Sequence, residues 1–249
     1  MAAVITNLHA IEEHLKRGSK PAELFVDTKG GHFRSRLKNI IDLAKSRGVR
    51  VSFVSPKDME RLLGKREHRG MALALEGSQT ASLKSFLREI REPRSLVIVL
   101  DRITDPHNLG AIIRSADQFS ADAVVLPTHG SARDNETVAA VSSGANAWVR
   151  VAVESNTRNA IEMLKKDGFW VFGADMQGDP ITQVHLEGKI ALVLGSEGKG
   201  LRRLVREGCD GLVSIPSAGH LDSLNVSVAA GILMFEVRRQ QKFFSAEKR

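Results

Sequence analysis

A strand-like apolar run that ends in a polar loop constrains the fold of this chain more than any other feature. Residues 96–101 are Leu-Val-Ile-Val-Leu-Asp, so five consecutive apolar side chains precede the first charge. A strand that is apolar on both faces is typical of a parallel sheet with helices on each side. From this strand onward, strand-like and helix-like segments alternate, which predicts an α/β fold with a mostly parallel sheet.

The hydrophobic pattern assigns the segments of this alternation. We expect further strands at 123–127, 149–154, 170–175, 190–195 and 212–216, and helices at 108–120, 135–146, 156–168 and about 225–241.

Residues 1–76 have the pattern of a smaller α/β unit. A helix is indicated at 34–48, because apolar side chains recur at 37, 40, 41 and 44 before Gly48 ends the pattern. Asn7 is expected to cap a helix that runs through Leu15. Strands are expected at 22–27, 49–55 and 71–76. We therefore predict three parts: a domain at 1–76, a linker with a helical segment at 77–92, and a second domain at 93–249.

Positive charge is concentrated in the N-terminal third. Residues 1–92 contain 18 Lys and Arg against 11 Asp and Glu, whereas residues 93–249 contain 18 of each, so the net charge of +7 lies in the first part. This asymmetry favours a polyanionic partner for that part, in particular a nucleic acid. A basic surface that only aids solubility is the alternative.

Two further features bear on the cellular location of the protein. No apolar run approaches the roughly 20 residues that span a bilayer, and residues 1–14 lack the pattern of a signal peptide. The single cysteine, Cys209, cannot form an internal disulfide and is expected to be a half-buried small residue. We expect a cytoplasmic protein with no membrane partner.

The first motif that could carry chemistry is the glycine-rich sequence Leu-Gly-Ser-Glu-Gly-Lys-Gly-Leu at 194–201, directly after a predicted strand. Small residues let the backbone approach a nucleotide or a related cofactor closely. The spacing differs from that of a dinucleotide fold or a P-loop, and the motif comes late in its domain. A glycine-rich turn without a ligand is the alternative.

The second motif, at 101–117, joins the strand at 96–101 to the next helix. Asn108 could cap this helix. Arg114 lies among apolar residues, where an arginine requires a partner or a cleft, and a structural ion pair is the alternative. His107 has no accompanying His, Cys or Asp constellation, so no metal site is expected.

The third motif, at 215–237, combines a polar loop with a helix of small residues. Ser223 and Asn225 lie just before that helix, and N-capping alone would need only one of them. The small residues permit close approach of another backbone, within the chain or in a second subunit.

Together the three motifs resemble the signature motifs of the SpoU, or TrmH-like, branch of the SPOUT RNA methyltransferases. The matching sequences are DPHNLGAIIRSAD, LVLGSEGKGL and IPSAGHLDSLNVSVAAG, in the order and spacing of the family. The sequences LHAIEEHL and HRGMAL resemble the L30-like N-terminal domain of its 23S rRNA guanosine 2′-O-methyltransferase (RlmB-like) subgroup. Two departures, Ser217 and the stretch at 220–222, leave the exact RNA target open.

The resemblance implies a C-terminal domain with a deep trefoil knot, a homodimer, and transfer of a methyl group from S-adenosylmethionine to a ribose 2′-hydroxyl of 23S rRNA. The cofactor would contact Gly195, Ile215 and Leu224. The implied catalytic residues are Asn108, Arg114, Glu197, Ser223 and Asn225. For these we expect Arg114 to hold the adjacent phosphate and to stabilise the developing alkoxide, Asn108 to orient Arg114, and Glu197 to hold Asn108 or the glycine loop.

The N-terminal domain would select the substrate through Arg34, Arg36, Lys65, Arg66 and Arg69. Three other functions remain open. A tRNA guanosine 2′-O-methyltransferase is disfavoured by the separate N-terminal domain, and a non-catalytic ribosome-assembly factor by the presence of all five catalytic residues. A Rossmann-type oxidoreductase or methyltransferase is disfavoured by the late glycine loop.

Overall fold

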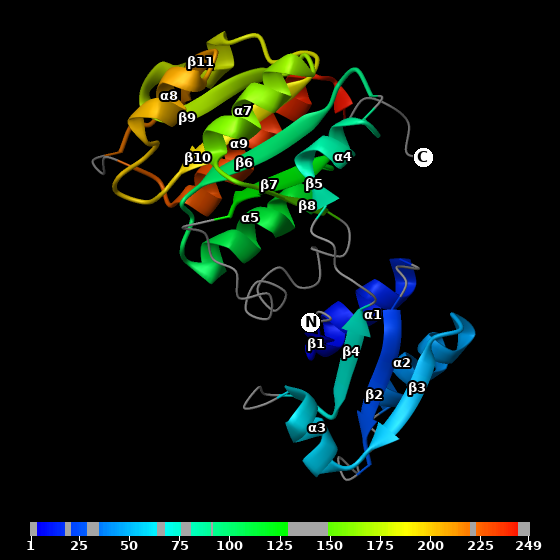
Figure 1. The fold of residues 1–249 in the computed structure, drawn as a ribbon. Coiled ribbons are helices and arrows are strands. Elements are labelled where there is room, and N and C mark those ends of the chain that lie inside the picture. The colour runs from blue at the N-terminus through cyan, green and yellow to red at the C-terminus, as the bar shows by residue number, and fades with distance from the viewer. Residues whose placement is uncertain are drawn as a thin grey trace. The chain divides into compact units, whose positions relative to one another are not determined.

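The computed structural model describes residues 4–17, 21–28, 35–63, 68–75, 81–90, 92–128, 149–219 and 223–243. These residues form two compact units, which divide between residues 79 and 80 (Figure 1). Each unit has its own sheet and its own apolar core. Among the described residues, no helix has both the length and the apolar character that crossing a membrane requires.

The N-terminal unit is a four-stranded sheet with the order β1-β4-β2-β3. Strand β4 (Met71–Leu75) pairs antiparallel with β1 (Val4–Ile5) and with β2 (Pro21–Asp27), and β2 pairs parallel with β3 (Arg50–Val54). Its helices are α1 (Leu8–Arg17), α2 (Ser35–Ser46) and α3 (Pro56–Leu63).

Local sequence signals account for much of this unit. The Oδ1 atom of Asn7 accepts the backbone N–H groups of His9 at 3.0 Å and Ala10 at 3.1 Å, which confirms the predicted cap. The apolar stripe predicted for α2 also enters the core, where Ile40, Ile41 and Ala44 are buried.

The second unit contains a seven-stranded sheet with the order β11-β9-β10-β6-β7-β8-β5, and its described pairings are all parallel. The parallel α/β architecture is therefore confirmed. The strands are β5 (Ala81–Ser82), β6 (Leu96–Asp101), β7 (Ala123–Pro127), β8 (Arg150–Glu154), β9 (Trp170–Pro180), β10 (Ile190–Gly195) and β11 (Gly211–Ser214).

Helices cover both faces of this sheet, which explains why β6 is apolar throughout. On one face, α4 (Leu83–Leu87), α7 (Thr157–Lys166) and α8 (Arg203–Gly208) share a core with Val97 and Val99 (Figure 1). Helices α5 (Pro106–Gln118) and α9 (Val226–Gln240) pack against each other, and α9 also packs on β10.

The segment predicted as a linker, 77–92, requires a correction, because residues 81–87 belong to the second unit. Strand β5 pairs parallel with β8, and the Oγ atom of Ser82 caps α4 by accepting the backbone N–H of Ser85 at 3.2 Å. Leu83 and Phe86 are buried in the core. A two-residue strand is too short to produce a recognisable alternation, so the pattern missed it.

One other segment differs from expectation, and one stays a prediction. Strand β9 continues past the predicted end at 175 to Pro180, and its pairing with β11 shifts register between Leu212 and Val213. The helix predicted at 135–146 lies outside the described residues.

Candidate functional site

Three polar side chains from the three motifs meet in one hydrogen-bonded cluster. The Nδ2 atom of Asn108 donates to Oε1 of Glu197 at 3.1 Å, and Nδ2 of Asn225 donates to Oδ1 of Asn108 at 3.0 Å. Asn225 Nδ2 also donates to Glu197 Oε1. We call Asn108, Glu197 and Asn225 the polar triangle. It joins α5, the loop after β10 and the start of α9, so the fold brings the three motifs together.

Asn108 does not have the local role that its position suggested. The N-cap of α5 is Asp105, whose Oδ1 atom accepts the backbone N–H of His107 at 2.9 Å. Asn108 lies in the first turn of α5 and is 8% exposed. Because a buried amide requires partners, its bonds to Glu197 and Asn225 hold it in place. The expected bond between Glu197 and Asn108 is therefore present.

Asn225 has two functions that use opposite ends of its amide. Its Oδ1 atom caps α9 by accepting the backbone N–H of Ser227 at 2.9 Å, and its Nδ2 atom joins the polar triangle. The start of α9 is thereby fixed to the other two motifs. Ser223 is exposed and is not the cap.

The glycine loop folds tightly against itself. Residues Ser196 and Gly200 form an isolated antiparallel bridge, with the backbone N–H of Gly200 donating to Ser196 O at 2.9 Å. A Cβ atom at Gly195 would lie 2.2 Å from the carbonyl carbon of Gly200, so only glycine permits this turn. Gly198 has φ +73°, and a Cβ atom there would meet nothing within 4 Å. The outer side of the loop is thus open.

The other two predicted cofactor contacts lie on neighbouring segments. Ile215 is half-buried and directly follows β11. Leu224 is 44% exposed and precedes the cap of α9. An exposed leucine next to a polar cluster offers an apolar surface to a ligand.

Arg114 is exposed on α5, about two helical turns after Asn108. Within the described part of the chain it has no ion-pair or hydrogen-bond partner, so the structural ion pair considered from the sequence is absent there. The expected orientation of Arg114 by Asn108 is also not found, because the partners of Asn108 are Glu197 and Asn225. No described residue occupies the guanidinium of Arg114, which leaves it available to an anion.

An ion pair behind the glycine loop, whose carboxylate is buried, was missed from the sequence. Asp101 is fully buried at the end of β6, and its Oδ1 atom accepts from Arg202 Nη2 at 2.6 Å and from Thr157 Oγ1 at 2.9 Å. Arg202 comes directly after the glycine loop, so this pair fixes the end of the loop to β6. A charge at the end of a fully apolar strand was the available signal, because a buried carboxylate requires a partner.

In the described residues no group of three or more His, Cys, Asp or Glu side chains has an arrangement that could hold a metal ion. Cys209 is partly buried and free, as expected. Burial raises the pKa of its thiol to about 12, so this cysteine is not a nucleophile at neutral pH.

Comparison with known proteins agrees with this geometry. The family model described as the SpoU rRNA Methylase family matches residues 95–235, which include the whole polar triangle. The chain belongs to this family. A second model, described as RNA 2′-O ribose methyltransferase substrate binding, matches residues 8–81 of this SpoU family member.

Individual relatives extend over most of the chain. The 23S rRNA (guanosine-2′-O-)-methyltransferase RlmB of Ralstonia nicotianae is 39% identical over 249 residues, covering 98% of each chain. The SpoU methyltransferase AviRb of Streptomyces viridochromogenes, solved with AdoMet, has a TM-score of 0.80 at 24% identity and covers 97% of this chain and 91% of its own. The A. aeolicus TrmH/SpoU tRNA modifying enzyme has a TM-score of 0.55 at 27% identity and covers only 66% of this chain and 84% of its own.

Proposed function

We propose that this protein transfers a methyl group from S-adenosylmethionine to the ribose 2′-hydroxyl of a guanosine in 23S rRNA. The polar triangle is the observation that carries the proposal. It joins residues from all three motifs of a SpoU methylase, and a relative with that activity in its name is 39% identical over the whole chain.

The residues present fit S-adenosylmethionine. The glycine loop leaves open space beside Gly198, so that its peptide groups are available to the polar edges of an adenine or a ribose. Leu224 and Ile215 supply apolar contact. In our proposal Gly195, Ile215 and Leu224 would hold the cofactor, largely through backbone groups, and Glu197 would fix the glycine loop beside it through its bonds to Asn108 and Asn225.

When bound, the cofactor supplies an electrophilic methyl group. The protein's part is to align the ribose oxygen with that group and to stabilise the alkoxide that develops as the hydroxyl proton leaves. Arg114 binds the adjacent phosphate and stabilises this charge. A guanidinium carries only donors and no acceptor, so it is not the base; the phosphate or a water molecule takes the proton.

The polar triangle has a positioning role in this mechanism. Asn108 holds Glu197 and Asn225, and therefore the glycine loop and the start of α9, in one arrangement. We place Ser223, which is exposed next to Leu224, at the bound nucleotide, where its hydroxyl can donate or accept a hydrogen bond.

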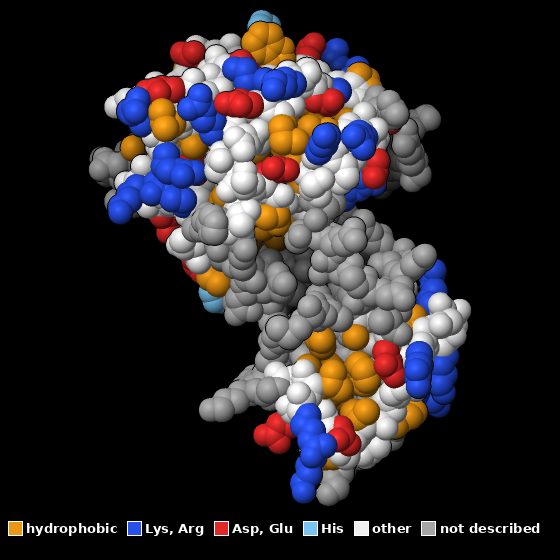
Figure 2. All heavy atoms as spheres, in the orientation of Figure 1, with side chains coloured by type: hydrophobic (Ala, Val, Ile, Leu, Met, Phe, Trp, Pro, Cys, Tyr) orange, Lys and Arg blue, Asp and Glu red, His pale blue; other side chains and the backbone are white. Residues whose placement is uncertain are grey.

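The N-terminal unit is the proposed RNA-binding domain, an L30-like fold that comprises residues 1–76. Figure 2 shows Lys and Arg side chains on the flanks of this unit, with apolar side chains between them. Of the five predicted contacts, Arg69 is described and exposed; Arg34, Lys65 and Arg66 lie outside the described residues, as does the side chain of Arg36. RNA affinity should fall with salt.

The catalytic unit, residues 93–249 together with 81–87, is proposed to contain the trefoil knot of its family and to form a homodimer. Exposed apolar side chains on α9 support the dimer: Val228 is 50% exposed and Ile232 is 39% exposed. A reducing cytoplasm suits the single free cysteine.

Ribosomal RNA is preferred to tRNA because the similarity to the tRNA-modifying enzyme covers only 66% of this chain. The test is to map 2′-O-methyl groups in 23S rRNA and tRNA from cells with and without the protein. Loss of one guanosine methyl group from 23S rRNA is expected. Loss from tRNA alone would contradict the rRNA assignment, and an unchanged map would contradict the enzyme.

A further inference from the structure

Arg102 has a backbone conformation that residues with a side chain rarely adopt. It directly follows β6 and has φ +60° in the left-handed region. Its neighbours hold it there, because Asp101 is fully buried and Ile103 is 2% exposed. Strain of this kind persists where the surrounding structure enforces it, and it is concentrated at functional sites.

The side chain of Arg102 also has no partner among the residues that the structure describes. Its Nε atom is buried and has no hydrogen-bond partner, and the guanidinium has no ion pair within the described residues. A buried donor without a partner is unfavourable, so the protein retains an unsatisfied group at this position. The adjacent carboxylate of Asp101 does not neutralise it, because that carboxylate binds Arg202 and Thr157.

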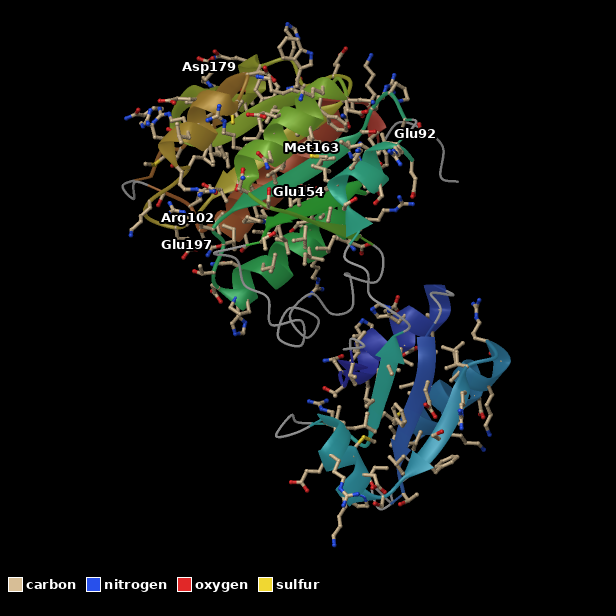
Figure 3. The ribbon with its side chains drawn as sticks, in the orientation of Figure 1. Glu92, Arg102, Glu154, Met163, Asp179 and Glu197 are labelled. Atoms are coloured by element: carbon tan, nitrogen blue, oxygen red, sulfur yellow. The ribbon has the colours of Figure 1, made fainter. Side chains whose placement is uncertain are left out.

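Arg102 lies next to the glycine loop. Asp101 pairs with Gly195 across β6 and β10, so Arg102 and Ser196 leave the sheet together at the same edge. Glu197 of the polar triangle is the next residue of that loop. Figure 3 shows Arg102 and Glu197 at this edge of the sheet.

We propose that Arg102 binds a backbone phosphate of the RNA next to the ribose that is methylated. This inference rests on the proposed function. A guanidinium fork matches the oxygens of a phosphate, and the outer Nη donors of this half-buried side chain are the ones that would meet the RNA.

Charge distribution favours Arg102 over the other arginines near the loop, because these already have partners. Arg202 binds Asp101 and Arg203 binds Glu207, each through an ion pair. Arg206 lies 3.4 Å from Asp175. Among the described arginines, Arg102 at the edge of the glycine loop therefore keeps donors available to a polyanion, as Arg114 does on α5.

The test compares Arg102→Gln and Arg102→Gly with the wild type and with Lys166→Gln. Lys166 is an exposed cation at the end of α7, the helix that leads into the start of β9, so this control removes one charge away from the carboxyl edge of the sheet. The measurements are the Kd for transcribed 23S rRNA over a range of salt, the Kd for S-adenosylmethionine by calorimetry, and Tm.

For Arg102→Gln we expect the RNA Kd to rise about tenfold and the slope of log K against log salt to fall by about one. The Kd for S-adenosylmethionine should change less than about twofold. Arg102→Gly should bind RNA as weakly but melt at the same or a higher temperature, because glycine tolerates positive φ. A purely structural role would not separate RNA binding from Tm in this way. Lys166→Gln should match the wild type.

Two results would overturn the assignment of Arg102. In one, RNA binding and its salt slope are unchanged in both variants. In the other, the cofactor Kd rises while the RNA Kd does not, which would make the carboxylate of the cofactor the partner. Absence of methyl transfer by the wild type would instead count against the proposed function, and the RNA-binding comparison would still decide the role of Arg102.

Discussion

The side chains of Asn108 and Glu197 are joined by a hydrogen bond of 3.1 Å although 89 residues separate them in the chain. Asn225, a further 28 residues beyond Glu197, closes the polar triangle by donating to both. A change at any one corner therefore removes two of the three hydrogen bonds. Activity should be more sensitive to these residues than stability is, because Glu197 and Asn225 are exposed.

Glu197→Ala should lower kcat by about 10- to 100-fold, because Asn108 and Asn225 lose their shared acceptor and the glycine loop loses its tie to α9. Glu197→Gln should lower it less, since an amide oxygen can still accept both bonds. Steady-state methyl transfer measures the effect, with Glu207→Ala as the control because Glu207 forms an exposed pair within α8. Equal activity of Glu197→Ala and wild type would contradict the positioning role.

Asn225→Ser should separate the two functions of this residue. A serine hydroxyl can still cap α9, so Tm should remain within a few degrees of wild type. It is too short to reach Asn108 and Glu197, so methyl transfer should fall by about tenfold or more. Asn225→Ala removes the cap as well, so its free energy of unfolding should be about 1 kcal/mol lower than that of Asn225→Ser. The prediction fails if Asn225→Ser keeps both its Tm and its activity, or loses both together.

Arg114→Ala should abolish methyl transfer, with a loss of about 100-fold or more, and should leave the Kd for S-adenosylmethionine nearly unchanged. The reason is that Arg114 is exposed and has no partner in the described part of the protein, so its removal leaves no buried group unsatisfied. Labelled methyl transfer and calorimetry measure the two effects. Turnover close to the wild-type rate would show that the role assigned to Arg114 is wrong.

Asp101→Asn should destabilise the second unit by about 2 kcal/mol, because it leaves Arg202 without its counter-ion. The figure is discounted because the side chain of Arg202 is 41% exposed and water can solvate part of its charge. Chemical denaturation measures the change, and Glu162→Gln, which removes a carboxylate from an exposed pair with Arg158, should be nearly neutral. An unchanged free energy of unfolding in Asp101→Asn would contradict the anchoring role of the pair.

Cys209 should react slowly with iodoacetamide in the native protein. Burial raises the pKa of its thiol from 9.0 to about 12, so its thiolate fraction near neutral pH falls about a thousandfold. As the chain contains one cysteine, mass spectrometry should find labelling only after denaturant is added. Because the thiol of the unfolded chain ionises first as pH rises, this group also makes stability decline between pH 9.0 and about 12. Rapid native labelling would contradict the burial.

Local patterns in the sequence predicted the sheet type and most of the described elements. The apolar run at 96–101 predicted a parallel sheet, because helices cover both faces of such a sheet and its strands are therefore apolar on both sides. Asn7 predicted a cap because the capping bond joins residues two and three positions apart. The residues of the polar triangle were also identified before the structure, through the resemblance of three motifs to those of a known family.

Only the tertiary structure decided which of these residues touch. Asp105, not Asn108, caps α5, which Pro106 at the first helical position already favours locally, whereas the partners of Asn108 come from the two distant motifs. The ion pair between Asp101 and Arg202 joins residues about a hundred positions apart in the chain. The left-handed backbone of Arg102 is fixed by neighbouring residues that are buried in the core. Local propensity involves a few adjacent residues, whereas a buried charge or amide takes its partner from wherever the fold brings one within reach.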